Sequence, residues 1–149
     1  MIEIVPATAA HARAIDLRDG DRREIEALGL PPREGLLRSL ARSIWAEAYL
    51  ADGEVAALLG VAMQPTVGGV AMPWLLTGRP VDRLRKTFLQ LTRARTQQML
   101  AEHGTLVAHV HADYREAVRW LAWLGFEIAP AQPTGARGAL FHQATMRTP

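Results

Sequence analysis

The stretch from Thr105 to Phe126 constrains the fold of this chain more than any other part of the sequence. Thr105–His111 predicts a strand, and Ala117–Leu124 predicts a short helix that ends at Gly125, a residue type that favours the left-handed conformation at helix ends. A strand that leads directly into a helix is half of a crossover unit, which belongs to a sheet with parallel strands. The sequence therefore predicts an α/β fold with a mixed sheet.

The rest of the pattern places three meandering strands and a long helix before this unit. The predicted strands are Ile2–Val5, Ile44–Leu50, Val55–Met63, Val70–Leu76, Thr105–His111, Glu127–Ala131 and Ala139–Met146. The predicted helices are Ala9–Leu17, Arg22–Leu28, Arg33–Ser43, Val81–His103 and Ala117–Leu124. The expected order is β-α-α-α-β-β-β-α-β-α-β-β, with helices on both faces of the sheet and one domain over residues 1–149.

Turn and breaker residues set the expected boundaries. Asp19-Gly20-Asp21 predicts a break before the second helix, and Asp52-Gly53 predicts a two-residue hairpin. A further turn is expected over Pro65–Gly69, and a loop over Gln132–Gly138. Pro73 cannot donate to a strand ladder, so an edge, a bulge or a separation of strands is expected around it.

Composition excludes several classes of protein. The net charge of +2 does not indicate a dominant nucleic-acid role, and the absence of cysteine excludes disulfides and a thiol nucleophile. Val55–Gly78 has no charged residue and is long enough to cross a membrane, but its Gly, Pro and polar residues favour two strands and a turn. The N-terminus shows no secretory signal. We expect a cytoplasmic protein with neither a membrane span nor a specific nucleic-acid partner.

The spacing from Ala117 to Gly125-Phe126, the opening IEIVPATAAHARAI and the element order together resemble the GCN5-related N-acetyltransferase (GNAT) superfamily. The resemblance implies the fold of that superfamily over nearly the whole chain. Two positions of its second signature differ, because Tyr114 stands where the family has Asn and Leu121 where it has Tyr. The family's tyrosine serves as general acid toward the leaving thiolate, and leucine has no proton to give.

The resemblance implies acetyl-CoA as the cofactor if the chain is an enzyme. It would lie where Val70–Leu76 and Thr105–His111 separate, with backbone N–H groups around Trp74, Leu75 and Leu76 at the thioester carbonyl. The family's glycine-rich phosphate loop corresponds to Thr77–Leu84. This segment departs from the pattern, because Gly78 is its only glycine, Pro80 lacks an N–H, and Asp82 adds negative charge.

Arginines at the start of the following helix could hold phosphates through their side chains instead, namely Arg79, Arg83 and Arg85. The alternative is a solvated basic face of a long helix, and we favour that alternative.

Three residues near the signature are candidates for proton transfer. Tyr114 could serve the leaving group, and His109 or His111 could deprotonate an amine. The pattern His109-x-His111-x-Asp113 also has ligand types that suit zinc or iron, but no further ligand is near in sequence, so we predict no metal site. Asp113 and Glu116 predict a capping box for the helix that follows.

Trp120 and Trp123 lie three residues apart on one short helix, so either the helix is buried nearly all round or one tryptophan faces a partner. At least one is expected in the core.

A narrower resemblance concerns the stretches DGDRREIEALG, LLRSLARS, GGVAMPWLLTG and RWLAWLGF, which are similar to internal virion protein A of tailed phages. It implies a phage or prophage protein that acts through contacts with another protein or with itself, in virion assembly or host interaction, and that is virion-associated or in the host cytoplasm. The alternative is a divergent acetyl-CoA-dependent N-acetyltransferase, and a regulatory binding module is a third class.

Overall fold

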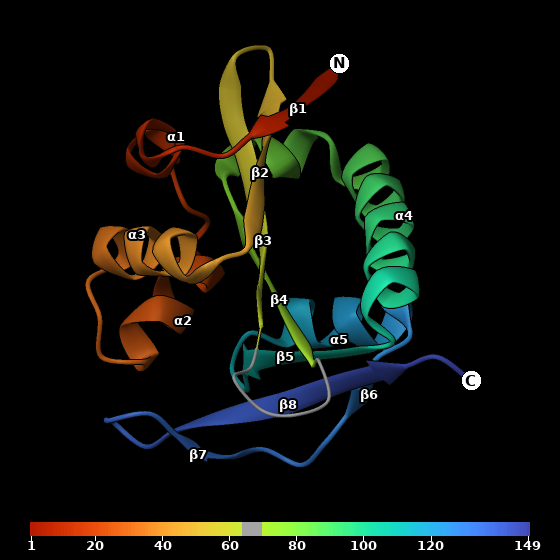
Figure 1. The fold of residues 1–149 in the computed structure, drawn as a ribbon. Helices are drawn as coiled ribbons and strands as arrows, with labels where there is room; N and C mark the ends of the chain where they lie inside the picture. The colour runs from red at the N-terminus through yellow and green to blue at the C-terminus, as the bar shows by residue number, and fades with distance from the viewer. Residues whose placement is uncertain (64–69) are drawn as a thin grey trace.

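The computed structural model describes residues 1–63 and 70–149. Its strands form one mixed sheet in the order β1-β2-β3-β4-β5-β8-β6, with β7 paired to β8 (Figure 1). The strands are β1 (Ile2–Pro6), β2 (Trp45–Ala51), β3 (Glu54–Met63), β4 (Ala71–Thr77), β5 (Thr105–His111), β6 (Glu127–Ile128), β7 (Gln132–Thr134) and β8 (Ala139–Arg147). The helices are α1 (Ala9–Ala14), α2 (Asp19–Ala27), α3 (Pro32–Arg42), the 3₁₀ helix η1 (Arg79–Arg83), α4 (Arg85–His103) and α5 (Arg115–Leu124).

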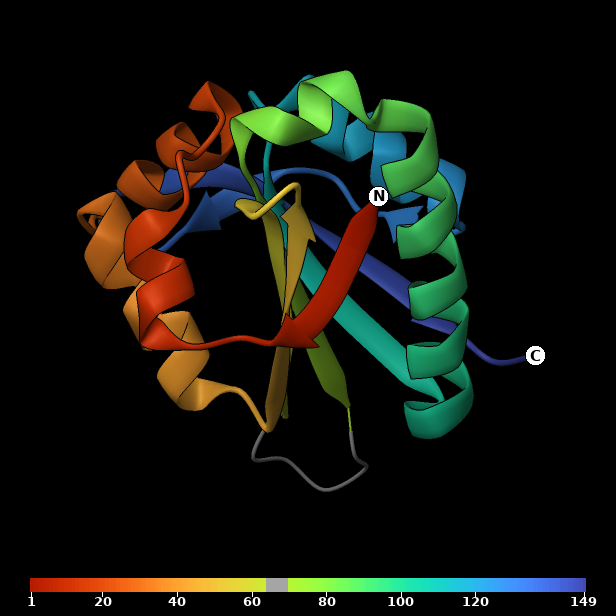
Figure 2. The ribbon, with the colours of Figure 1, turned by 90° about the horizontal axis from the view of Figure 1, so that it is seen from above.

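Helices cover both faces of the sheet, as the sequence predicts. The first three helices lie on one side of the strands β2 to β4 and α4 lies on the other (Figures 1 and 2). Each side has its own apolar core. Leu36, Leu58 and Val55 centre the core beneath α1 to α3, and Tyr49, Phe88 and Leu106 belong to the core beneath α4 and α5. The alternation of buried side chains along β3 supplies both cores from one strand.

The strands β4 and β5 separate almost as soon as they meet. They are parallel and share a single paired position, Ala71 with Leu106, after which their directions diverge (Figure 1). On its other edge β4 is paired with β3 without interruption, from Met63–Ala71 to Ala57–Thr77. The separation thus opens a gap in an otherwise continuous sheet, at the place where Pro73 predicts an irregularity.

Most predicted elements are confirmed, with boundaries shifted by a few residues. The Asp52-Gly53 turn is confirmed, since both residues have positive φ, 50° and 83°. Asp19-Gly20-Asp21 does not break the chain, because these residues form the first turn of α2. The loop expected over Gln132–Gly138 contains the short strand β7. The turn expected over Pro65–Gly69 lies outside the described residues.

Two predictions about helix starts are wrong. The long helix does not begin at Val81, since η1 precedes it and α4 begins at Arg85. The capping box of Asp113 and Glu116 does not form. Tyr114 is the N-cap of α5 and has no side-chain cap, and Glu116 accepts hydrogen bonds from Arg18.

Candidate functional site

A cavity of about 700 Å³ occupies the space between the separated strands β4 and β5. Its walls also include residues of α2, α4 and α5, and most of them are apolar, as in sites that bind small molecules. We call the space around Leu75, Glu24 and Trp120 the inner part of the cleft. The outer part is the rim formed by Arg18, Asp82, Arg85 and Glu116, where α4 and α5 begin.

Strand alternation points the backbone of Leu75 into the cleft. Gly78 donates its N–H to Ala56 of β3 at 2.7 Å, whereas the N–H of Thr77 goes to Asp21, away from β3. Because the ladder with β3 has no register shift, the next residue of the same parity, Leu75, also faces away from β3. Pro73 has this parity too, so the strand loses no ladder bond at the proline. The backbone N–H of Leu75 therefore faces the inner part of the cleft and has no hydrogen-bond partner in a neighbouring strand that the structure describes.

Two carboxylates of α2 hold the separated ends of β4 and β5. Asp21 accepts the Thr77 N–H at 3.2 Å, at the end of β4, and Glu24 accepts the His111 N–H at 2.9 Å, at the end of β5. The two residues are three apart, so they lie on one face of the helix. This helix thus replaces the missing strand pairing with hydrogen bonds from its side chains.

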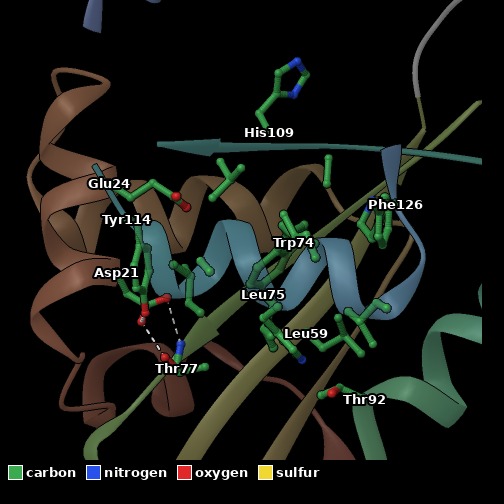
Figure 3. Close-up of a pocket in the computed structure, with 18 of the residues that line it drawn as sticks. Asp21, Glu24, Leu59, Trp74, Leu75, Thr77, Thr92, His109, Tyr114 and Phe126 are labelled. Carbon is green, nitrogen blue, oxygen red and sulfur yellow. Dashed lines mark hydrogen bonds between the residues drawn. The ribbon is translucent and has the colours of Figure 1, made fainter. Parts of the chain in front are cut away.

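Asp21 is almost completely buried, at 3% exposure. It also accepts hydrogen bonds from the hydroxyl of Thr77 and, at 2.9 Å, from the hydroxyl of Tyr114 (Figure 3). Burial raises the pKa of the Asp21 carboxyl, and its three donors oppose that rise. Gly20 leaves no space for a side chain, because a Cβ there would overlap the Tyr114 ring.

Glu24 lines the cavity and has the pKa of a group that titrates near neutrality. Burial raises this pKa from 4.5 to about 7, the backbone N–H of His111 lowers it, and the charge of Asp21 raises it further. A carboxyl with such a pKa is present in both protonation states at neutral pH. It can therefore accept and release a proton during a reaction.

Ion pairs line the outer part of the cleft. Glu116 of α5 makes a bidentate contact with Arg18, with both distances 3.0 Å, and contacts Arg85 of α4 at 3.0 Å. Asp82 contacts the same two arginines, at 3.1 Å and 3.6 Å. Burial opposes the charged form of Arg18, but its bond to Glu116 and the nearby charges raise its pKa overall. These contacts join the start of α2 to the starts of both later helices.

The phosphate grip that the resemblance implies does not fit this rim. Five backbone N–H groups of the segment before α4 already have acceptors in the chain, those of Thr77, Gly78, Arg79, Val81 and Leu84. Arg79 pairs with Asp16 and Asp19. Arg85 pairs with Glu116 and Asp82, so only Arg83 of the three expected arginines has no ion pair within the described residues. A diphosphate at this position would meet two carboxylates.

The expected residues Trp74, His109 and Tyr114 also line the cavity. Trp74 donates its Nε1–H to Ser43 at 2.7 Å on the α3 side, and strand parity turns the backbone N–H groups of Trp74 and Leu76 toward β3. Tyr114 lines the cavity, but its hydroxyl proton is directed to Asp21, and burial and that carboxylate raise its pKa. His109 is exposed and points away from Tyr114 on the far side of β5 (Figure 3).

His111 and Trp120 each pack against another aromatic ring. The ring of His111 packs on Phe141 at 5.2 Å, and its Nε2 lies 4.0 Å from Asp113. Within the described residues no group of three side chains is placed to hold a metal ion.

Trp120 packs in the core against Phe88, as expected for at least one tryptophan. Its Nε1–H is buried without a hydrogen-bond partner in the part of the chain that the structure describes.

Sequence reasoning missed the two carboxylates Asp21 and Glu24. The sequence does contain a signal for them. Asp21 and Glu24 are three residues apart, and the apolar residues Ile25 and Leu28 lie in the same short segment. Asp21 was instead assigned to the predicted break Asp19-Gly20-Asp21, and Glu24 was given no role. None of the helices in the described residues is long and apolar enough to cross a membrane.

Comparisons with known proteins support the fold. No protein-family model and no curated protein matches the sequence. Among solved structures, a proposed acetyltransferase from Acinetobacter baylyi matches with a TM-score of 0.72 and 12% identity, over 99% of this chain and 93% of that chain. An acetyltransferase of the GNAT family from Streptococcus pneumoniae matches with a TM-score of 0.64 and 12% identity, over 99% and 100%.

A GNAT superfamily phosphinothricin acetyltransferase from Sinorhizobium meliloti, solved in complex with acetyl-CoA, matches with a TM-score of 0.64 and 13% identity, over 98% of this chain and 88% of that chain. The expected likeness to phage internal virion proteins receives no support from these comparisons. The similarity in structure at such low identity concerns the fold alone. The chain has the fold of the GNAT acetyltransferases.

Proposed function

We propose that this chain is a divergent N-acyltransferase, which moves an acyl group from a thioester to an amine. One observation carries the proposal. The backbone of Leu75 faces the same cavity that Glu24 lines, between strands whose separation leaves room for a substrate. A hydrogen-bond donor for a carbonyl oxygen and a proton acceptor for an amine are the two groups that such a transfer needs.

The Leu75 N–H would hold the thioester carbonyl oxygen, which gains negative charge as the amine nitrogen attacks the carbonyl carbon. The unpartnered Trp120 Nε1–H would donate to an amide carbonyl of the donor's pantetheine arm. Apolar walls strengthen both hydrogen bonds by excluding water.

Glu24 would act as the base. Its pKa of about 7 lets its carboxylate take one proton from the incoming ammonium group at neutral pH. The amine nitrogen then forms the C–N bond as the C–S bond breaks, and its second proton goes to the departing thiolate. The products are an amide and a free thiol.

A second candidate is a function in protein contact without catalysis, and the ion pairs of the outer part favour it. Arg79 and Arg85 already pair with carboxylates where a coenzyme's phosphates would bind. The phage origin and the virion or host-interaction role expected from the sequence belong to this candidate.

Amide formation distinguishes the two. Acetyl-pantetheine, which has no diphosphate, is incubated with the protein and a panel of primary amines, and the amide product is identified by mass spectrometry. Glu24→Gln should lower the rate about 100-fold, because it removes the base but keeps an oxygen for the His111 N–H. Glu26→Gln, an exposed position on the same helix, is the matched control and should keep the rate. Absence of amide with every amine would favour the second candidate.

A further inference from the structure

A basic and aromatic surface runs along α4 and α5 beside the cleft. It consists of Lys86 and Arg93 on α4 and of Arg115, Arg119 and Trp123 on α5, all exposed, and we call it the basic strip. Arg115, Arg119 and Trp123 follow one another at helical spacing and share a face. The guanidinium of Arg93 lies 5.0 Å from the centre of the Trp123 ring, so the two helix faces adjoin.

The charges of the basic strip are not neutralised by any residue that the structure describes. Its four cations form no ion pair with any residue in 1–63 or 70–149, whereas Arg85 and Arg95 of the same helix α4 pair with Glu116 and Glu47. Four unpaired cations on adjoining helices attract an acidic partner, and the attraction falls with salt.

The basic strip borders the cavity. Arg119 and Trp123 contribute to its wall together with Leu89, which lies between Lys86 and Arg93 along α4. A macromolecule bound on the basic strip would thus lie next to the opening of the cleft. A flexible arm from such a partner could reach the inner part from there.

The two parts of the cleft favour a thioester donor of a particular kind. The inner part has a donor at Leu75 and the unpartnered Trp120 Nε1–H, both suited to a pantetheine thioester. In the outer part a diphosphate would meet the carboxylates of Asp82 and Glu116, which already pair with Arg18 and Arg85. Phosphopantetheine thioesters occur on coenzyme A and on carrier proteins, and only the first has that diphosphate.

We infer that the acyl donor is an acidic carrier protein, which docks on the basic strip while its phosphopantetheine arm enters the cleft between β4 and β5. This inference rests on the proposed acyl transfer. The transferred atoms are the same as with a small thioester, and the free thiol stays on the carrier's arm.

The test compares acetyl groups on three donors: an acidic acyl carrier protein, acetyl-pantetheine and acetyl-CoA. The carrier should be used with a kcat/KM at least about tenfold above that of acetyl-CoA, equivalent to about 1.4 kcal/mol. Binding of the labelled carrier is followed separately by fluorescence anisotropy, at low and at high salt, without any amine. Affinity should fall as salt rises.

Charge reversal on the basic strip provides the decisive variant. Lys86→Glu combined with Arg115→Glu should weaken carrier binding at least about tenfold. Arg13→Glu combined with Arg33→Glu makes the same change in net charge on exposed, unpaired positions of α1 and α3 within the described residues, and should leave carrier binding nearly unchanged.

Three outcomes would overturn the inference: equal use of acetyl-CoA and carrier, unchanged carrier binding in the charge-reversal variant, or loss of acetyl-CoA binding in that variant. The last would assign the basic strip to the nucleotide of a coenzyme. These outcomes leave the proposed function standing if acetyl-pantetheine still yields amide. Failure of all three donors to acylate any amine would instead reject the proposed function, whatever the anisotropy measurement gives.

Discussion

In the inner part of the cleft and beside it at Asp21, the polar groups are few. Backbone or hydroxyl donors satisfy the carboxylates of Asp21 and Glu24, and the Trp120 Nε1–H has no partner within the described residues. In the outer part, full charges pair with one another at the surface. Asp21 is 3% exposed, whereas the side chains of Asp82 and Glu116 are 50% and 40% exposed. Buried polar groups are costly to leave unpaired, and exposed ion pairs contribute little to stability. The inner part therefore supports the fold, and the outer part can change without unfolding the protein.

Removing the Asp21 carboxylate should have the largest effect. Asp21→Ala leaves three buried donors of Thr77 and Tyr114 without an acceptor, so the free energy of unfolding should fall by about 3–5 kcal/mol. Urea unfolding at neutral pH measures the change. Glu26→Ala, exposed on the same helix, should change stability by less than about 0.5 kcal/mol. Equal losses of stability in Asp21→Ala and Glu26→Ala would mean that the buried hydrogen bonds of Asp21 stabilise the protein no more than an exposed side chain does.

The pH dependence of stability should reflect Glu24. Its pKa is about 7 in the folded protein against an ordinary 4.5, so the folded state binds more protons between these values. The contribution of Glu24 to the free energy of unfolding is fully present below the lower pKa. It is lost as the pH rises through the higher pKa, a decrease of about 3 kcal/mol. The buried Asp21, whose pKa is also raised, acts in the same direction.

Urea unfolding from about pH 4 to about pH 8 would follow this decline. Glu24→Gln should flatten most of it. A wild-type stability that rises steadily across the same range would contradict the assignment.

Filling the space at Gly20 should test how tightly α2 is packed against α5. Gly20→Ala gains about 1 kcal/mol of helix propensity, but its methyl group overlaps the Tyr114 ring. The overlap should prevail and give a net loss of about 2 kcal/mol. In the Tyr114→Ala background the same substitution should be neutral or stabilising, and a double-mutant cycle of thermal unfolding measures the difference. Additive effects would show that the two residues do not press on each other.

The smallest effect on stability, and the most direct test of the contrast, concerns Glu116. Glu116→Gln removes a negative charge from the outer part and releases Arg18 and Arg85. Stability should change by less than about 1 kcal/mol. Affinity for acetyl-CoA should rise about tenfold, since one charge near a diphosphate corresponds to about 1.4 kcal/mol.

Calorimetric titration of acetyl-CoA gives the affinity. Glu102→Gln, near the far end of α4, is the control and should leave it unchanged. Unaltered affinity in Glu116→Gln would show that the ion pairs are not what excludes the coenzyme.

The sequence predicted what depends on neighbours along the chain. The order of elements, the Asp52-Gly53 turn and the irregularity at Pro73 all follow from local backbone preferences. It could not predict what depends on partners far apart. Glu116 resembles a helix cap, but its partner Arg18 lies 98 residues away.

Asp21 and Glu24 show the same limit. As acidic residues near a helix start, they resemble solvent-exposed caps. They are buried because β4 and β5 separate and leave Thr77 and His111 with free N–H groups, 56 and 87 residues along the chain. No pattern within α2 records that separation.

The parity of β4 restricts how this chain can evolve. The donor that we propose is the backbone N–H of Leu75, so a change of this side chain leaves the donor in place. An insertion or deletion of one residue between Ala71 and Thr77 would turn that N–H toward β3 and would place Pro73 where the ladder needs a donor. Among homologues, β4 should thus keep its length.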